Sequence, residues 1–80
     1  MMRLDKFLKV SRLIKRRTIA NEACDNGLVN VNDKPVRASY AVNVGDVIEI
    51  RLGARVTRVE VVSVTEHAAK GEAALLYREV

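Results

Sequence analysis

Side chains that carry catalytic or metal chemistry are scarce in this sequence. Its 80 residues include one cysteine, one histidine and no tryptophan. A lone thiol, Cys24, cannot form an internal disulfide, and His67 has no second imidazole or thiol cluster to complete a metal site. Because no candidate base lies near Cys24 in the sequence, a buried structural role is favoured over a catalytic one. We therefore expect no metal, no cofactor and no enzymatic activity.

Other absences narrow the class further. The four glycines lie singly at turns rather than in a phosphate-binding loop, and three aromatic rings are too few for a base-stacking platform. Charged residues interrupt the N-terminal segment, so it does not read as a signal peptide. No stretch reaches the roughly 18 apolar residues of a membrane-spanning helix. These features predict a cytoplasmic protein that does not bind membranes.

Apolar residues are abundant enough for a folded core. They make up 49% of the chain, and charged residues make up 30%, which is the composition of an ordinary globular protein. At this length a domain buries about 60% of the surface that its unfolded chain exposes. We expect residues 1–80 to form a single domain.

The charge is concentrated at one end of the sequence. Residues 1–20 carry seven basic side chains against one acidic, a formal charge of +6, whereas the remaining residues carry seven basic and nine acidic. A local basic patch is typical of proteins that bind polyanions, although a charge run can also be a merely solvated face. Our candidate binding residues are this basic set: Arg3, Lys6, Lys9, Arg12, Lys15, Arg16 and Arg17.

Two short helices are predicted around this basic set. An apolar stripe at i, i+3, i+4 and i+7 from Leu4 to Ser11 predicts a helix over residues 3–10 with Asp5, Lys6 and Lys9 on its outer side, followed by a turn at 11–15. A second helix, read from Ile19, Ala20, Ala23 and Cys24, would end at Gly27, whose missing Cβ suits a left-handed cap. Its first turn would contain Lys15, Arg16 and Arg17. Cations there oppose the helix dipole by about 0.3–1 kcal/mol each.

Strands are predicted after Gly27. Residues 28–31 alternate and reach a tight turn at Asn32-Asp33, with Pro35 suited to an edge strand. Residues 47–52 also alternate, and Gly53-Ala54 leads into a β-branched run over 55–64, with a bulge expected near Val61-Val62. Residues 65–71 are predicted to be loop, and apolar spacing over 72–80 predicts a short C-terminal helix. The fold class is α+β: an αα hairpin packed on a small antiparallel sheet.

The order and spacing of several motifs resemble the RNA-binding domain named after ribosomal protein S-four. The similarity covers about residues 3–52 and rests on Arg3-Leu4-Asp5-Lys6-Phe7-Leu8, Arg17, Ala20, Gly27-Leu28-Val29-Asn30-Val31-Asn32, Ser39-Tyr40 and Gly45-Asp46-Val47-Ile48. Residues 53–80 would add a strand and the C-terminal helix, and 72–77 resemble the corresponding segment of the RqcP branch and of the small ribosome-associated heat-shock proteins. The chain ends without the long basic tail of the latter, which favours the RqcP branch.

This resemblance implies a function that composition alone does not. It implies a factor of ribosome-associated quality control that binds 23S rRNA and peptidyl-tRNA on obstructed large ribosomal subunits, beside an RqcH/NEMF-type factor that extends the stalled chain with alanine. By position, Arg3 and Arg17 match basic residues of the family's RNA-contacting motif, with Arg12, Lys15 and Arg16 beside them. The protein is expected to be a ribosome-associated monomer. Lys15 replaces the serine N-cap found elsewhere in the wider family, and Asn32-Asp33 replaces Asn-Gly.

Three alternatives remain open. The chain could be a heat-shock-type factor that recycles blocked large subunits. It could also be an adaptor whose basic set binds an acidic protein and contacts RNA only incidentally. An enzymatic role for Cys24 would predict loss of function in Cys24→Ala.

Overall fold

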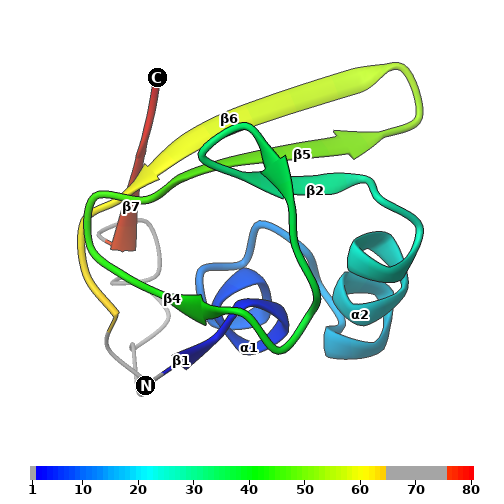
Figure 1. The fold of residues 1–80 in the computed structure, drawn as a ribbon, viewed down its shortest axis with the longest axis horizontal. Helices are drawn as coiled ribbons and strands as arrows, with labels where there is room; N and C mark the ends of the chain where they lie inside the picture. Colours follow the sequence, from blue (N-terminus) through cyan, green and yellow to red (C-terminus); the bar gives the residue numbers. More distant parts are fainter. Residues whose placement is uncertain (1, 65–75) are drawn as a thin grey trace.

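Two helices pack together on one side of an antiparallel sheet (Figure 1). The computed structural model describes residues 2–64 and 76–80. In these ranges the element order is β1 (Met2–Arg3), α1 (Leu4–Val10), α2 (Arg17–Asp25), β2 (Val29–Val31), β3 (Lys34–Pro35), β4 (Ala41–Val42), β5 (Val47–Leu52), β6 (Arg55–Val61) and β7 (Tyr77–Glu79). Helix α1 lies within one residue of its predicted bounds. The structure confirms the α+β class.

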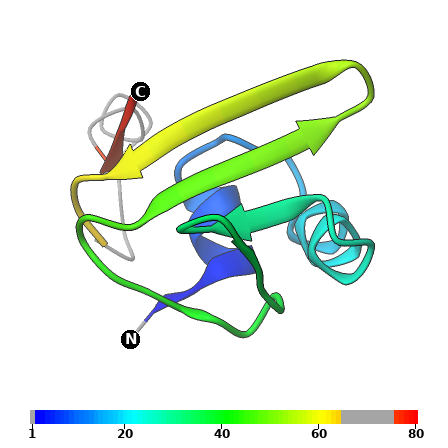
Figure 2. The ribbon, with the colours of Figure 1, turned by 45° about the horizontal axis from the view of Figure 1, so that its top comes forward.

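The described strands form two antiparallel groups. The main sheet has the order β3-β2-β5-β6-β7, and β1 pairs with β4 in a separate two-stranded ladder. Strands β5 and β6 form the longest pairing, from Val47 opposite Glu60 to Leu52 opposite Arg55, and their hairpin extends beyond the rest of the sheet in Figures 1 and 2. Strand β3 with Pro35 lies at an edge, as predicted.

Residues with positive φ mark the end of α2 and the turn between β2 and β3. Helix α2 ends at Asp25, and Gly27 follows with a φ of 72°, so the predicted left-handed glycine is confirmed. Asn32 and Asp33 both have positive φ, 52° and 67°, between the paired residues Val31 and Lys34. This is the two-residue loop of a type I′ hairpin, formed without the usual glycine.

The core lies between the helices and the sheet. Its largest fully buried side chains come from α1 and from the strands, and α2 contributes only small ones, which lets it approach its neighbours closely. Ile19, expected on the packed face of α2, is instead 44% exposed. The buried apolar set of α2 is therefore Ala20, Ala23 and Cys24.

The C-terminal helix prediction is wrong for the residues that the structure describes. Tyr77–Glu79 form strand β7 on the outer edge of β6, with Val61 opposite Tyr77 and Glu60 opposite Arg78. The segment predicted to be helical has only nine residues, and apolar spacing over so short a run does not separate a helix from a strand. The unpaired backbone groups along the edge of β6 favour pairing with another strand. Residues 72–75 of that prediction, and the predicted loop at 65–71 with His67, lie outside the described residues.

The bulge predicted at Val61-Val62 has a counterpart where β6 ends. The N–H groups of Val62 and Ser63 both donate to the carbonyl oxygen of Leu76, at 2.8 and 3.1 Å. Two residues therefore oppose one, which is the arrangement of a β-bulge. Among the described residues, no helix has the length and apolar character needed to cross a bilayer.

Candidate nucleic-acid interface

A buried carboxylate organises the start of both helices. Asp5, in the first turn of α1, has a side chain that is only 3% exposed. It accepts hydrogen bonds from Arg3 Nε at 3.2 Å, Arg17 Nη2 at 3.4 Å and Asn21 Nδ2 at 3.3 Å, and from the Lys6 N–H at 2.8 Å. The expectation that Asp5 lies on the solvent side of α1 is therefore wrong. These donors offset the cost of burying its charge.

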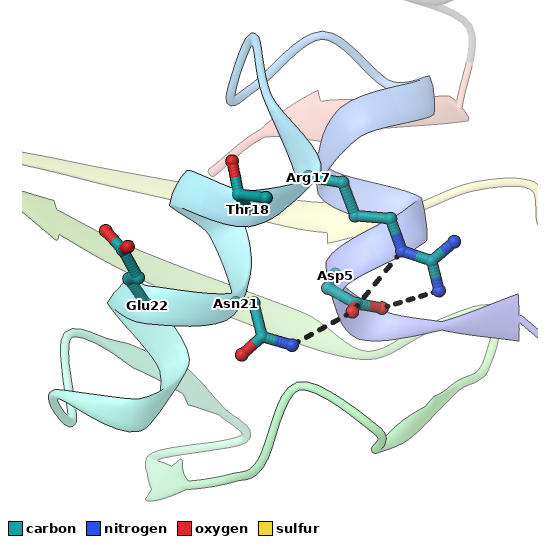
Figure 3. A pocket seen from close by; sticks show the side chains of 5 residues that line it. All are labelled: Asp5, Arg17, Thr18, Asn21 and Glu22. Carbon is teal, nitrogen blue, oxygen red and sulfur yellow. Dashed lines mark hydrogen bonds and ion pairs between the residues drawn. The ribbon is translucent and has the colours of Figure 1, made fainter.

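The consequence is that two distant arginines lie side by side. Arg3 precedes α1 and Arg17 begins α2, and each guanidinium contacts Asp5 through Nε while the side chain stays 51% and 46% exposed, respectively. Figure 3 shows Arg17 and Asn21 converging from α2 on Asp5 of α1. An arginine held on one side by a carboxylate keeps further N–H donors for a second acceptor, such as a phosphate.

Backbone bonds from a distant segment fix the geometry at Asp5. Helix α1 has no side-chain N-cap. Instead the N–H groups of Leu4 and Asp5 donate to the carbonyl oxygens of Tyr40 and Ala38, at 2.8 and 3.1 Å. The segment between β3 and β4 thus satisfies donors that an α-helix leaves unpaired at its start.

The loop between the helices presents the next group of basic residues. Ser11 and Ile14 are buried and anchor it, since Ser11 Oγ and the Ile14 N–H both donate to the Leu8 carbonyl oxygen. Arg12, Lys15 and Arg16 between and after these anchors are exposed. Arg12 has a φ of 64°, the left-handed region that a side chain with a Cβ rarely adopts.

Only part of the predicted crowding at the start of α2 is found. Arg17 is the first helical residue, Arg16 is the N-cap, and Lys15 lies before the helix. The first turn contains no acidic residue, and the cap has no side-chain hydrogen bond. Fewer cations than expected therefore oppose the helix dipole directly.

The two remaining candidates lie on α1. Lys6 is half-buried, and Lys9 is exposed in the last turn, where its charge suits the helix dipole. The structure therefore brings Arg3 and Arg17 together at Asp5 and places the other candidates along α1 and the following loop.

A depression of about 410 Å³ adjoins the Asp5 cluster. It is lined by Asp5, Arg17, Thr18, Asn21 and Glu22 (Figure 3). Arg17 and Asn21 are four residues apart and so share one face of α2, next to the line formed by Thr18 and Glu22. Sequence reasoning missed Asp5 and Asn21 as parts of the site. The only local signal was the charge of Asp5 next to the apolar stripe of α1. The contacts of Asp5 with Arg17 and Asn21 span 12 and 16 residues of the sequence, so no local pattern reveals them.

The pKa of Asp5 shows which effect dominates in this cluster. Burial by itself raises the pKa, but hydrogen bonds from Arg17, Arg3 and Asn21 and the charge of Arg17 outweigh it and hold the pKa below the ordinary 3.8. Asp5 is therefore ionised at neutral pH and acts only as an acceptor.

Cys24 lacks the environment of a reactive thiol. It is buried on α2, and desolvation, followed by the charges of Asp5 and Asp25, raises its pKa to about 11. A nucleophilic cysteine needs a depressed pKa and solvent access. Among residues 2–64 and 76–80 there is also no cluster of three potential metal ligands.

Known proteins with a similar sequence or fold identify the class of protein. Residues 2–48 match the S4 domain family, and the fold matches that of Heat Shock Protein 15 from Vibrio cholerae with a TM-score of 0.91, at 30% identity over 99% of this chain and 81% of that one. That protein's structure is described as trimeric. The arrangement of two helices on an antiparallel sheet is thus the S4-type RNA-binding fold.

Two sequence relatives refine this placement. The chain is 51% identical to the RQC P-site tRNA stabilizing factor of Halalkalibacterium halodurans and 47% identical to that of Bacillus subtilis, over 95% of this chain in each case and over 86% and 88% of the relatives. The chain therefore belongs to the S4 domain family and, within it, to the group of the RQC P-site tRNA stabilizing factors.

Proposed function

We propose that this protein is a non-enzymatic RNA-binding factor of ribosome-associated quality control. It binds 23S rRNA and peptidyl-tRNA on obstructed large ribosomal subunits and assists an RqcH/NEMF-type partner in adding alanine to the stalled chain. The observation that carries the proposal is the pair of half-exposed arginines, Arg3 and Arg17, that the buried Asp5 holds side by side. The names of the two relatives and their 51% and 47% identity support the ribosomal assignment.

Two kinds of contact make up the proposed RNA surface. Arg3 and Arg17 are preorganised by Asp5, so little side-chain entropy is lost when they bind phosphates. The other basic residues contribute mainly long-range attraction to the polyanion: Lys6, Lys9, Arg12, Lys15 and Arg16. Such contacts position an RNA without reading its sequence.

The proposal includes the cellular setting and the assembly state. We place the protein in the cytoplasm on large ribosomal subunits, as one domain acting as a monomer. Light scattering of the purified protein tests the last point, since the Vibrio cholerae relative is described as trimeric.

Co-sedimentation with large ribosomal subunits tests the function. Tagged protein is expected to pellet with subunits that carry peptidyl-tRNA, and Arg16→Ala together with Arg17→Ala is expected to abolish this. A control with the same loss of charge is Lys34→Ala together with Arg55→Ala, because both residues are exposed and lie on the strands. Binding that survives the first pair of substitutions would contradict the site, and equal loss in both would point to net charge alone.

A second candidate function is the recycling of blocked large subunits by a heat-shock-type factor. The match to Heat Shock Protein 15 favours it. An alanine-tailing assay with the RqcH/NEMF-type partner separates the two, because only the first function predicts longer alanine tails when this protein is added. Ribonuclease treatment separates both from an adaptor, which would keep its protein partner after the RNA is removed.

A further inference from the structure

We propose that Asn21 accepts a hydrogen bond from a ribose 2′-hydroxyl and so makes the depression beside α2 selective for RNA over DNA. The inference rests on the proposed RNA-binding function and concerns a residue outside the basic set. It assigns a role to the polar side of the depression, which phosphate contacts leave unused.

The contact with Asp5 fixes the orientation of the Asn21 amide. Nδ2 of Asn21 lies 3.3 Å from Asp5 Oδ2. Because an ionised carboxylate only accepts hydrogen bonds, the NH2 group must face it, and the amide oxygen Oδ1 must point away. Asn21 is half-buried and lines the depression. The structure therefore offers a fixed, neutral acceptor about one helical turn from Arg17, and Figure 3 shows this oxygen directed away from Asp5.

The depression has two chemically different ends. Arg17 supplies N–H donors and a positive charge, whereas Asn21 and Glu22, about one helical turn further along α2, supply oxygen acceptors. The phosphodiester group of a nucleic-acid backbone satisfies only the first end, since it has no proton to donate at the second. A nucleotide satisfies both when its phosphate contacts Arg17 and its sugar lies over Asn21.

The sugar group that matches the acceptor is present only in RNA. A 2′-hydroxyl can donate a hydrogen bond, and this group is what allows a protein to distinguish RNA from DNA at a given position. A carboxylate at position 21 would be a similar acceptor but would repel Asp5, whereas an amide binds Asp5 and accepts from the ligand at the same time.

Fluorescence anisotropy with two chemically matched oligonucleotides tests this inference without altering the protein. The probes are a 20-nucleotide stem-loop RNA and the same sequence with 2′-fluoro groups, which keep a small electronegative substituent but lack the donor proton. The natural chain is expected to bind the RNA about 2–10-fold more tightly, the effect of one net hydrogen bond. Equal affinities, or binding to neither probe, would overturn the proposal.

Substitutions then assign the preference to Asn21. Asn21→Ala is expected to bring the ratio of the two affinities to about one. Because this substitution also removes a donor to Asp5, the measured quantity is the ratio and not the affinity for either probe alone. The matched control is Asn26→Ala at the exposed C-terminal end of α2, which should keep the preference. If Thr18→Val rather than Asn21→Ala removed it, the proposal would be wrong.

The two levels of the proposal fail differently. If Arg16→Ala together with Arg17→Ala leaves ribosome binding intact, the proposed RNA surface is wrong. If those substitutions weaken the binding of both probes equally, and the natural chain binds the RNA and the 2′-fluoro probe with the same affinity, only the role of Asn21 is wrong. Circular dichroism of Asn21→Ala checks that the variant is folded, and the probe comparison on the natural chain is independent of it.

Discussion

Asp5 combines a structural and a functional demand in one side chain. It is buried, it contacts donors from both helices, and the arginines that it holds remain half-exposed. Because those arginines can return to water when the Asp5 carboxylate is removed, the protein should lose less stability than it would from breaking a fully buried ion pair.

The first prediction concerns Asp5→Asn. An asparagine amide would direct its own N–H donors toward guanidinium donors, so we expect the free energy of unfolding to fall by about 1–3 kcal/mol. RNA affinity should fall as well, because Arg3 and Arg17 lose their fixed orientation. Urea denaturation and anisotropy measure the two effects. Asp25→Asn, which removes an exposed carboxylate at the end of α2, should change stability by less than about 0.5 kcal/mol. Unchanged RNA affinity in a folded Asp5→Asn protein would argue against preorganisation.

The same carboxylate predicts how stability depends on pH. The folded state holds the pKa of Asp5 below 3.8, so the stabilisation is present above that value and disappears as the pH falls through the folded pKa. We expect the free energy of unfolding to decline in acid below about pH 4. Denaturation curves at several pH values should show a smaller decline for Asp5→Asn than for the natural chain. An identical decline in both would mean that other carboxylates cause it.

Cys24 gives a prediction about reactivity. With a pKa of about 11, roughly one thiol in a thousand is ionised at pH 8, and the residue as a whole is 5% exposed. We expect iodoacetamide to label the native protein at least about 100-fold more slowly than the urea-unfolded chain. Mass spectrometry at fixed times measures both rates, and Cys24 is the single cysteine that can react. Rapid labelling of the native protein would revive an enzymatic role.

The loop between the helices places function and stability in opposition. Arg12 follows α1 at a φ of 64°, in a conformation that costs a residue with a Cβ roughly 1–2 kcal/mol. Glycine would be the ordinary choice there. We propose that contact with RNA accounts for an arginine at this position.

Two substitutions of Arg12 separate the backbone from the charge. Arg12→Gly and Arg12→Ala both remove the guanidinium, so we expect the same loss of RNA affinity from each. Because only glycine also relieves the backbone, Arg12→Gly should be more stable than Arg12→Ala by about 1 kcal/mol in urea denaturation. If the two variants are equally stable, Arg12 carries no strain.

Local sequence signals predicted those elements that local physics determines. The stripe of α1, the glycine after α2 and the alternation in β5 each determine structure within a few residues. Strand β1 has only two residues and no periodicity of its own, and β7 exists because β6 offers an edge. For the same reason the basic set could be identified from the sequence, whereas the role of Asp5 could not, since it depends on how α1 and α2 pack.

Charge is distributed unevenly between the helical and strand parts of the chain. The segment through residue 20 has a formal charge of +6, and the remainder has −2. Both α1 and the start of α2 fall within the basic part, so we expect a polyanion to meet the helices before the strands. The sheet then acts as the scaffold that holds the helix pair in place.

This distribution predicts the salt dependence of RNA binding. If about 4–6 phosphates are contacted, the logarithm of the binding constant should fall with the logarithm of salt concentration at a slope of roughly −3 to −5. Each arginine that contacts a phosphate should account for about one unit, so Arg16→Ala together with Arg17→Ala should make the slope shallower by about 2. Anisotropy at several potassium chloride concentrations measures it. Lys34→Ala together with Arg55→Ala removes the same charge from the strands and should leave the slope unchanged. An equal change of slope in both double variants would mean that attraction depends on net charge alone. A change confined to Arg16→Ala with Arg17→Ala identifies the start of α2 as part of the surface that displaces counterions from RNA.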